Sequence, residues 1–208
     1  MISRFALLPA LAALLLAVPS AQAQFVLGVN LGGAAVTIDG NLWQSDTAAL
    51  ANGFSFTTAG SFANFTYGGA PVPAVDAATA TMLSDVRYIP FGTPSVTIHQ
   101  TVLNGLAYRV DLWAYEAVLG FGRSADISGD VASTNFDNLP LSGWEARSLT
   151  TGIINDGSID FTITPLNNQP VLSGFAIFQL VPEPSAGSLA ILALVALVRR
   201  RRRAGCEA

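Results

Sequence analysis

Residues 106–114 alternate strictly between apolar and more polar side chains, and this period of two limits what the chain can fold into. Successive side chains of a β-strand point to opposite faces, so the pattern predicts a strand with one buried face. Residues 158–164 repeat the alternation, and Trp113 falls on the outward face of the first segment. The side chains predicted to face inward are Leu106, Tyr108, Val110, Leu112, Ala114, Ile159, Phe161 and Ile163.

Turn motifs accompany these two segments. Asn104-Gly105 and residues 155–157 contain residue types that accept a positive φ, which favours tight hairpins and therefore antiparallel pairing. Residues 171–181 are apolar on both faces, as in a central strand covered by a second sheet. No segment of comparable length carries the apolar stripe of a helix. We therefore predict an all-β fold, a single antiparallel β-sandwich of jelly-roll type.

The region between Thr47 and Thr81 is rich in Ala, Gly, Ser and Thr, and its strands are harder to assign. Two short strands are suggested by Phe54–Phe56 and Phe62–Phe65. The stretch Pro71-Val72-Pro73 predicts a loop, because proline lacks a hydrogen-bond donor that a strand needs.

The first 23 residues have the features of a secretory signal peptide, which would form a helix outside the folded domain. Arg4 supplies the positive charge, and residues 5–18 form the apolar segment. Ala21-Gln22-Ala23 supplies the small residues that signal peptidase recognises, so cleavage is predicted after Ala23. The chain is therefore expected to be exported, with signal peptidase as a partner.

The last segment, residues 181–208, joins Pro182-Glu183-Pro184 to an apolar run and a basic cluster. The run, residues 186–198, has 13 residues, whereas a helix needs about 20 to span a bilayer. We therefore predict a short transmembrane helix that spans only marginally. The basic cluster would stay on the cytoplasmic side, which places the preceding domain outside that membrane. It consists of Arg199, Arg200, Arg201, Arg202 and Arg203.

Together, these features resemble the PEP-CTERM sorting signal of exported proteins in bacteria that make extracellular polysaccharide. The resemblance covers Val181 to Arg203 and includes the Gly187-Ser188 lead-in. It implies that an exosortase recognises the tail and cuts near the Pro-Glu-Pro motif. The protein would then be anchored transiently in the inner membrane before it reaches the cell surface or extracellular matrix. An ordinary C-terminal membrane anchor is the alternative, but it does not explain the Pro-Glu-Pro motif.

The remaining residues, 24–180, are predicted to form one domain that is stabilised by its core alone. The only cysteine, Cys206, lies beyond the arginines, so no disulfide can form within the domain. Four arginines, no lysine and twelve acidic residues give the domain a net charge of −8. This charge argues against binding to nucleic acid or to an anionic membrane surface. Neutral glycans or cations fit it better.

The domain has few side chains suited to catalysis. His99 is the only histidine, and no nucleophile motif lies near it in the sequence. No cluster of His, Cys and carboxylate residues has the spacing of zinc ligands. A pair of glycosidase carboxylates stays open, although Asp111 and Glu116 would point to opposite faces of a regular strand. We predict that the domain is not an enzyme and needs no cofactor.

Acidic residues in the predicted loops leave a structural calcium ion open as a possibility. They are Asp39, Asp126, Asp130 and Asp137. Their spacing does not match an EF-hand loop, so solvated turn carboxylates are the favoured interpretation.

A series of short motifs resembles those of malectin-like carbohydrate-binding domains, in the same order. The motifs are residues 29–33, 37–43 with Asp46, 85–88, 104–116, 122–127, 135–137 and 168–175. The resemblance implies that loops at one end of the sandwich present aromatic residues and an acid or amide to a sugar. The matching binding positions are Tyr88, Phe121 and Asn168. Phe121 stands for an aromatic pair in the family, and Asn168 replaces a carboxylate; Tyr88 and Phe121 could instead be core or rim aromatics.

These features lead to one main hypothesis and two alternatives. The main hypothesis is an exported surface or matrix protein whose non-catalytic sandwich associates with polysaccharide. One alternative is a purely structural or adhesive matrix component without sugar binding. The other is a glycoside-acting enzyme.

Overall fold

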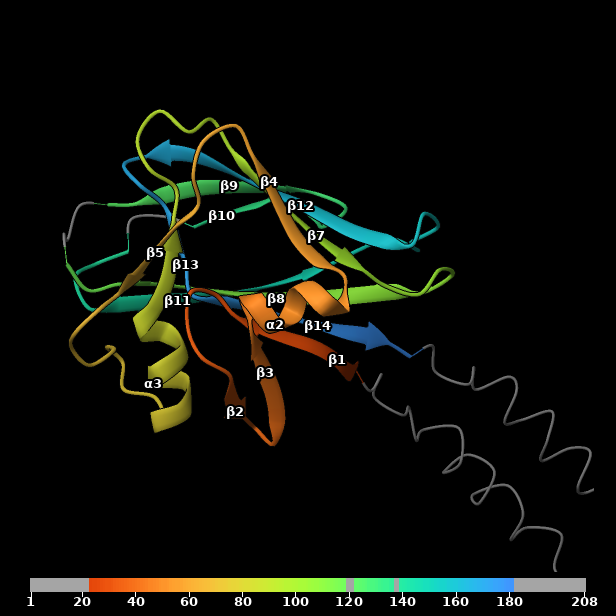
Figure 1. Cartoon of the computed structure of the whole chain (residues 1–208), viewed down its shortest axis with the longest axis horizontal. Helices are drawn as coiled ribbons and strands as arrows, with labels where there is room; N and C mark the ends of the chain where they lie inside the picture. The colour runs from red at the N-terminus through yellow and green to blue at the C-terminus, as the bar shows by residue number, and fades with distance from the viewer. Residues whose placement is uncertain (1–22, 119–121, 137–138, 182–208) are drawn as a thin grey trace, which may run out of the picture. The chain divides into compact units, whose positions relative to one another are not determined.

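The computed structural model describes residues 23–118, 122–136 and 139–181, which form two facing β-sheets and a smaller third sheet (Figure 1). The six-stranded sheet contains, in spatial order, β11 (Gly143–Thr150), β8 (Ala107–Glu116), β14 (Gly174–Leu180), β1 (Ala23–Asn30), β3 (Asn41–Ser45) and β2 (Val36–Ile38). The five-stranded sheet contains β10 (Thr134–Phe136), β9 (Ser124–Gly129), β12 (Ser158–Asn167), β7 (Val96–Thr101) and β4 (Phe54–Thr58). The three-stranded sheet contains β13 (Val171–Leu172), β6 (Asp85–Tyr88) and β5 (Ala63–Thr66). The prediction of an all-β sandwich is confirmed.

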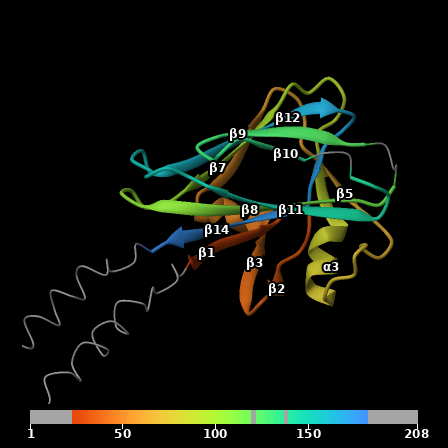
Figure 2. The ribbon, with the colours of Figure 1, turned by 180° about the vertical axis from the view of Figure 1, so that it is seen from behind.

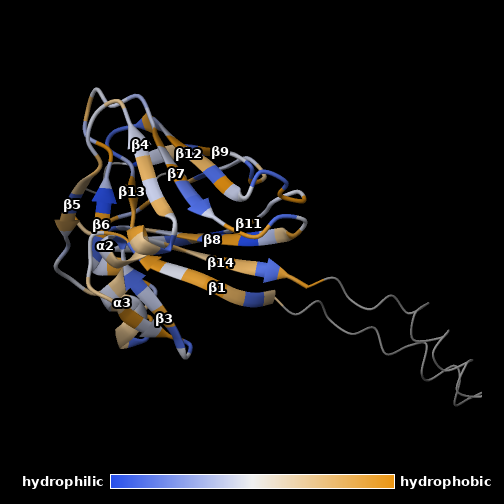
Figure 3. Ribbon diagram, turned by 45° about the vertical axis from the view of Figure 1, so that its right-hand side comes forward, coloured by the Kyte–Doolittle hydropathy of each residue, from blue (hydrophilic) through white to orange (hydrophobic). Residues whose placement is uncertain are grey.

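The core lies between the two large sheets. The side chains predicted to face inward in the two alternating segments are buried, apart from the half-buried Leu106. Phe175 of β14 packs against Phe54 of β4 and Phe161 of β12, with ring centroids 5.6 and 5.7 Å apart, and so joins the two sheets. Figure 3 shows the alternation as bands of hydrophobic and hydrophilic colour along the strands. Both predicted alternations are therefore confirmed.

The two predicted turns are present, but they connect the two large sheets instead of forming hairpins. Gly105 and Gly157 have positive φ angles of 79° and 85°, as the turn motifs require. The strands around the first turn, β7 and β8, belong to different sheets, as do β11 and β12 around the second. The hairpin prediction was wrong because a turn motif specifies a change of direction and leaves the partner of the next strand open. The repeated crossing between sheets fits the predicted jelly-roll type.

One pairing also departs from the antiparallel prediction. β1 pairs with β14 in antiparallel fashion on one side and with β3 in parallel on the other. Both contacts are possible because the chain returns through β2, which forms an antiparallel hairpin with β3. Gly28 of β1 lies against the ring of Trp43 in β3, where a Cβ atom would be 2.6 Å from the ring. Close approach therefore requires glycine at this position.

Helical segments are present where the sequence showed no apolar stripe. They are α2 (Asp46–Ala49), the 3₁₀ turn η1 (Leu50–Asn52) and α3 (Ala77–Ser84). The carboxylate of Asp76 accepts hydrogen bonds from the backbone N–H groups of Ala78 (2.9 Å) and Thr79 (3.0 Å), and so caps α3. Only Met82 and Leu83 of α3 are buried. A helix that buries two adjacent residues has no stripe to detect.

Three further sequence predictions are confirmed. β4 and β5 lie at the two short strands suggested by phenylalanines. The predicted central strand 171–181 is confirmed for Gly174–Leu180, which forms β14 inside the six-stranded sheet, whereas Val171–Leu172 forms β13 of the three-stranded sheet. Trp113 lies on the outward face of β8, where it is half-buried and packs edge-on against Trp43 with ring centroids 5.0 Å apart.

The two ends of the described chain lie side by side, because Ala23 of β1 pairs with Leu180 of β14 (Figure 2). Apart from Ala23, the predicted signal peptide with Ala21 lies outside the described residues. The same holds for Pro182-Glu183-Pro184, for the apolar run 186–198 and for the arginine cluster 199–203. Within the described part of the chain, no helix is long and apolar enough to cross a membrane.

Candidate functional site

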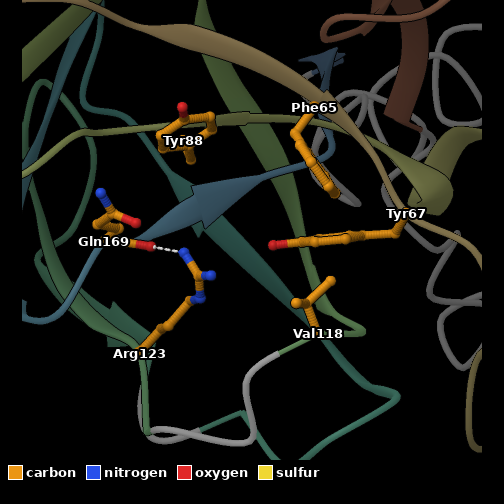
Figure 4. A pocket seen from close by; sticks show the side chains of 6 residues that line it. All are labelled: Phe65, Tyr67, Tyr88, Val118, Arg123 and Gln169. Carbon is orange, nitrogen blue, oxygen red and sulfur yellow. Dashed lines mark hydrogen bonds between the residues drawn. The ribbon is translucent and has the colours of Figure 1, made fainter.

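A cavity of about 200 Å³ opens beside the three-stranded sheet, and Figure 4 shows the side chains around it. Its walls come from β5 and the residue just after it, from β6, from the segments that follow β8 and precede β9, and from the segment before β13. The lining residues are Phe65, Tyr67, Tyr88, Val118, Arg123 and Gln169.

Backbone pairing in the three-stranded sheet brings these distant segments together. β6 is the middle strand, with Tyr88 opposite Ala63 of β5 on one side and opposite Val171 of β13 on the other. The backbone N–H of Tyr67 donates to the carbonyl oxygen of Ser84 at 2.7 Å, which continues the contact beyond the end of β5. Tyr88 is therefore held between the chain segments that supply the other walls.

Three aromatic side chains line the cavity, Phe65, Tyr67 and Tyr88, and the first two belong to a row of rings in edge-on contact. Phe65 packs edge-on against Tyr67 with ring centroids 5.2 Å apart, and Tyr67 packs edge-on against Tyr115 at 5.7 Å. Tyr115 is fully buried and Tyr67 almost so, whereas Phe65 is 48% exposed. The row thus runs from the interior to the surface, and its outer end offers an accessible aromatic face.

Arg123 forms the polar side of the cavity and is held by two partners. Its Nε forms an ion pair with Oε2 of Glu116, and its Nη1 donates a hydrogen bond to the backbone oxygen of Gln169 (Figure 4). Glu116 is fully buried, and its Oε1 accepts a hydrogen bond from the N–H of Val118 at 2.7 Å. The guanidinium of Arg123 is therefore held in place by two partners, and Glu116 balances its charge.

Tyr67 keeps its hydroxyl proton throughout the neutral pH range. Burial raises the pKa of Tyr67 to about 12; Arg123 acts in the opposite direction, and the negative charge of Glu116 adds to the rise. The cavity therefore presents a neutral hydroxyl at this point, which can donate or accept a hydrogen bond.

A second ion pair holds β6, the strand that carries Tyr88. Nε of Arg87 donates to Oδ2 of Asp46 at 2.7 Å, and its Nη2 lies 2.6 Å from the same atom. The guanidinium also stacks over the rings of Phe56 and Phe62, 4.8 and 5.5 Å from their centroids. Asp46 belongs to α2, and Arg87 belongs to β6 beside Tyr88. The ion pair therefore ties the strand that carries Tyr88 to a distant segment of the chain.

The structure places the three predicted binding residues differently. Tyr88 lines the cavity. Asn168 does not, because it has a positive φ of 54° and its amide donates to the carbonyl of Gly122 at 3.3 Å; its neighbour Gln169 lines the cavity instead. Phe121 lies outside the described residues, between Val118 and Arg123, which both line the cavity.

Sequence reasoning did not single out the other lining residues. Phe65 was recognised only as part of a strand, and Tyr67, Arg123 and Gln169 carried no motif of their own. Arg123 and Gln169 did lie within or beside the motifs that resemble malectin-like domains, which is the one signal that could have drawn attention to them.

The carboxylates that were weighed as a glycosidase pair have separate surroundings. Asp111 accepts a hydrogen bond from Ser148 at 2.6 Å and pairs with Arg109 at 3.1 Å. Glu116 pairs with Arg123 beside the cavity. His99 lies on β7 and its Nδ1 is 2.9 Å from Oδ1 of Asp160, where both side chains are about 40% exposed. His99 is remote from the cavity lining.

Among the described residues, no group of three or more His, Cys, Asp or Glu side chains is arranged to hold a metal ion. Asp39 occupies a turn with a positive φ of 50°, and Oδ2 of Asp130 accepts a hydrogen bond from the N–H of Asp160 at 2.7 Å. Asp126 is exposed on β9, and Asp137 lies outside the described residues.

The fold is similar to that of solved extracellular domains of malectin-like type, which supports the resemblance read from the sequence motifs. The ANX2 ectodomain from Arabidopsis thaliana has this fold with a TM-score of 0.65 and 15% identity, over 78% of this chain and 52% of that one. The ANXUR1 extracellular domain from the same plant gives a TM-score of 0.63 and 15% identity, over 78% and 50%. A β-glucuronidase from Bacteroides uniformis gives 0.56 and 15%, over 74% of this chain and 18% of the enzyme.

The present chain spans about half the length of the plant proteins and much less of the enzyme. At this level of identity, the similarity establishes the fold alone. No protein-family model matches the sequence, and no curated protein is significantly similar to it.

Proposed function

We propose that this protein is an exported surface or matrix protein whose sandwich binds polysaccharide through the cavity, without catalysing a reaction. The combination of lining side chains supports this proposal. Phe65, Tyr67 and Tyr88 offer rings on which the apolar face of a pyranose can stack. Arg123 and Gln169 offer hydrogen-bonding groups for its hydroxyls.

Export through the signal peptide and release through the PEP-CTERM-like tail are part of the proposal. Both ends of the sandwich leave from one place, since Ala23 pairs with Leu180 and Leu180 pairs with Ala107. β8 has 10 residues and runs from Ala107 to Glu116 beside the cavity, a length of about 33 Å at the usual rise per residue. The ends of the sandwich at Ala23 and Leu180 therefore lie about one strand length from Glu116. The plant proteins of similar fold are themselves extracellular domains.

The positions of the carboxylates support binding without catalysis. Hydrolysis of a glycosidic bond ordinarily needs two carboxyl groups that flank the bond. None of the described residues that line the cavity is a carboxylate, and Glu116 is fully buried in its ion pair. Among the described lining residues, a bound sugar would therefore meet aromatic rings, one aliphatic side chain and groups that donate or accept hydrogen bonds.

A glycan screen with the protein purified from an export-competent bacterial host tests the binding part of the proposal. We expect binding to at least one neutral polysaccharide, and we expect Phe65→Ala to abolish it. Phe91→Ala is the matched control, because it removes the same side chain from a position that is 75% exposed and outside the cavity lining. Equal binding by both variants would show that the cavity is not the site. Absence of binding by the unaltered protein would leave a structural or adhesive matrix role as the better explanation.

The sorting part of the proposal has its own test. Mass spectrometry of the protein released by a host that encodes an exosortase should find a C-terminus near Pro182-Glu183-Pro184. Recovery of released protein with Arg199–Arg203 intact would contradict processing of the tail. Deletion of the exosortase should leave the protein in the membrane fraction.

A further inference from the structure

The sandwich contains four arginines, and each is paired with a carboxylate of the same domain. The pairs are Arg87 with Asp46, Arg109 with Asp111, Arg123 with Glu116, and Arg147 with Glu145. The domain has no lysine, and its acidic side chains outnumber its arginines by eight. Across the described residues, therefore, an anionic ligand meets only guanidinium groups whose charge is already balanced.

The cavity shows this charge balance most clearly. Arg123 is the only charged side chain among the described residues that line it, and only 6% of this side chain is exposed. Its partner Glu116 is fully buried and does not line the cavity. A ligand carboxylate would have to lose water to reach the guanidinium and would also face the Glu116 charge through a medium of low dielectric constant. A ligand hydroxyl loses less hydration and accepts the same hydrogen bond.

The size of the cavity limits what it can enclose. Its volume is about 200 Å³, whereas pockets for drug-sized ligands occupy roughly 300–1,000 Å³. The cavity therefore suits a single sugar ring, with the rest of a chain left outside.

We propose that the Glu116–Arg123 pair determines specificity, so that the cavity accepts one uncharged pyranose ring and rejects uronates. This inference rests on the proposed sugar-binding function. Among the described lining residues, the pair leaves one guanidinium, which donates hydrogen bonds while its charge is balanced by Glu116. Glu116 acts through Arg123 and does not line the cavity itself, so it is a positioning and charge-balancing residue.

Matched pairs of methyl glycosides test the inference, each pair consisting of a neutral hexoside and its uronate, for glucose, galactose and mannose. NMR titration of the purified protein should show binding of at least one hexoside and about tenfold weaker binding of its uronate, a difference of about 1.4 kcal/mol. Equal or tighter binding of the uronate would overturn the inference and leave sugar binding intact. Failure to bind any glycoside or polysaccharide would instead contradict the proposed function.

The variant Glu116→Gln tests the role of the pair directly. It leaves Arg123 with an unbalanced charge, so uronate binding should improve about tenfold relative to the hexoside. The gained affinity should fall as NaCl is raised, because salt screens a charge–charge attraction. Unchanged discrimination in a folded Glu116→Gln protein would contradict the inference.

Two controls accompany this variant. Glu145→Gln makes the same change of side chain and net charge at the Arg147 pair, outside the cavity lining, and should leave discrimination unchanged. The double variant Glu116→Gln/Arg123→Gln removes both charges and should lose the gained uronate affinity and its salt dependence. If Glu116→Gln does not fold, the comparison of hexoside and uronate in the unaltered protein still tests the inference, because equal or tighter binding of the uronate would overturn it.

Discussion

Two clusters of three aromatic rings lie in the same sandwich, with similar contacts and different surroundings. Ring centroids are 5.6 and 5.7 Å apart in the core cluster, and 5.2 and 5.7 Å apart in the cavity cluster. The core cluster consists of Phe54, Phe175 and Phe161, and the cavity cluster of Phe65, Tyr67 and Tyr115. No ring in the core cluster is more than 2% exposed, whereas Phe65 is 48% exposed.

Contact geometry alone therefore does not separate a cluster inside the core from one that reaches the surface. The core cluster takes rings from both large sheets and is closed on every side. The cavity cluster begins at a buried ring on β8 and ends at an exposed one on β5, in the small three-stranded sheet. Where a second large sheet covers the rings, they are buried and stabilise the fold. Where no second sheet covers them, one ring stays exposed and can contact a ligand.

The largest effect on stability is expected for Phe175→Ala in the core cluster. Phe175 is fully buried and contacts rings from the opposite sheet, so its removal should lower the free energy of unfolding by about 3–5 kcal/mol. Urea denaturation followed by tryptophan fluorescence measures the change. A loss below about 1 kcal/mol would mean that the two sheets are not joined at this point.

Arg87→Met should have the next largest effect, because it leaves the carboxylate of Asp46 buried without its cation. We expect a loss of about 3 kcal/mol and weaker glycan binding, since Arg87 fixes the strand that carries Tyr88. Arg147→Met is the matched control, because its pair with Glu145 is 31% and 23% exposed and should contribute less than about 1 kcal/mol. Similar losses in the two variants would contradict the supporting role of the Arg87 pair.

High pH should destabilise the cavity cluster before it affects the core cluster, which has no titratable ring. The pKa of Tyr67 is raised by burial from 10.0 to about 12 in the folded protein. The neutral phenol therefore contributes stability that is complete below pH 10 and is lost as the pH rises from 10 through 12, where the unfolded chain ionises first. The melting temperature of the unaltered protein should fall relative to that of Tyr67→Phe across this range. A constant difference between them would contradict the raised pKa.

The smallest effect on stability is expected for Phe65→Ala in the cavity cluster. Phe65 is 48% exposed and contacts a ring on one side only, so the loss should be about 1 kcal/mol or less. Glycan binding should nevertheless be lost. The same substitution at Phe175 and Phe65 thus separates a ring that supports the fold from one that supports the proposed function, and equal destabilisation would remove the distinction.

The strands were predictable because their signal is local. Burial of alternate side chains leaves a period of two within each strand, and Val110 or Phe161 carries that signal whatever the partner strand is. The three-residue spacing of hydrophobic residues was not available for α3, which buries only Met82 and Leu83. The turn at Gly105 was predictable from residue type, but the sheet joined by the next strand was not.

The candidate site was predictable only in part. Tyr88 was identified through a resemblance in motif order and does line the cavity. Asn168, identified in the same way, does not line it, and its neighbour Gln169 does. The Glu116–Arg123 pair was not predicted, because Glu116 was considered only as a possible glycosidase carboxylate and Arg123 only as part of a motif that resembles malectin-like domains.

The sequence by itself determined the strands at residues 106–114 and 158–164, which of their faces lies against the core, and that the domain carries excess negative charge without a disulfide. The strand pattern depends on residues that are neighbours in the sequence, and the charge and the lack of a disulfide follow from counting residue types. Only the tertiary structure decided that Phe175 is enclosed between sheets, that Phe65 is not, and that Glu116 balances the charge of Arg123. These contacts and exposures depend on which strands pair and on which sheets face each other. Both are settled only when the whole domain folds, so no single segment of the sequence reveals them.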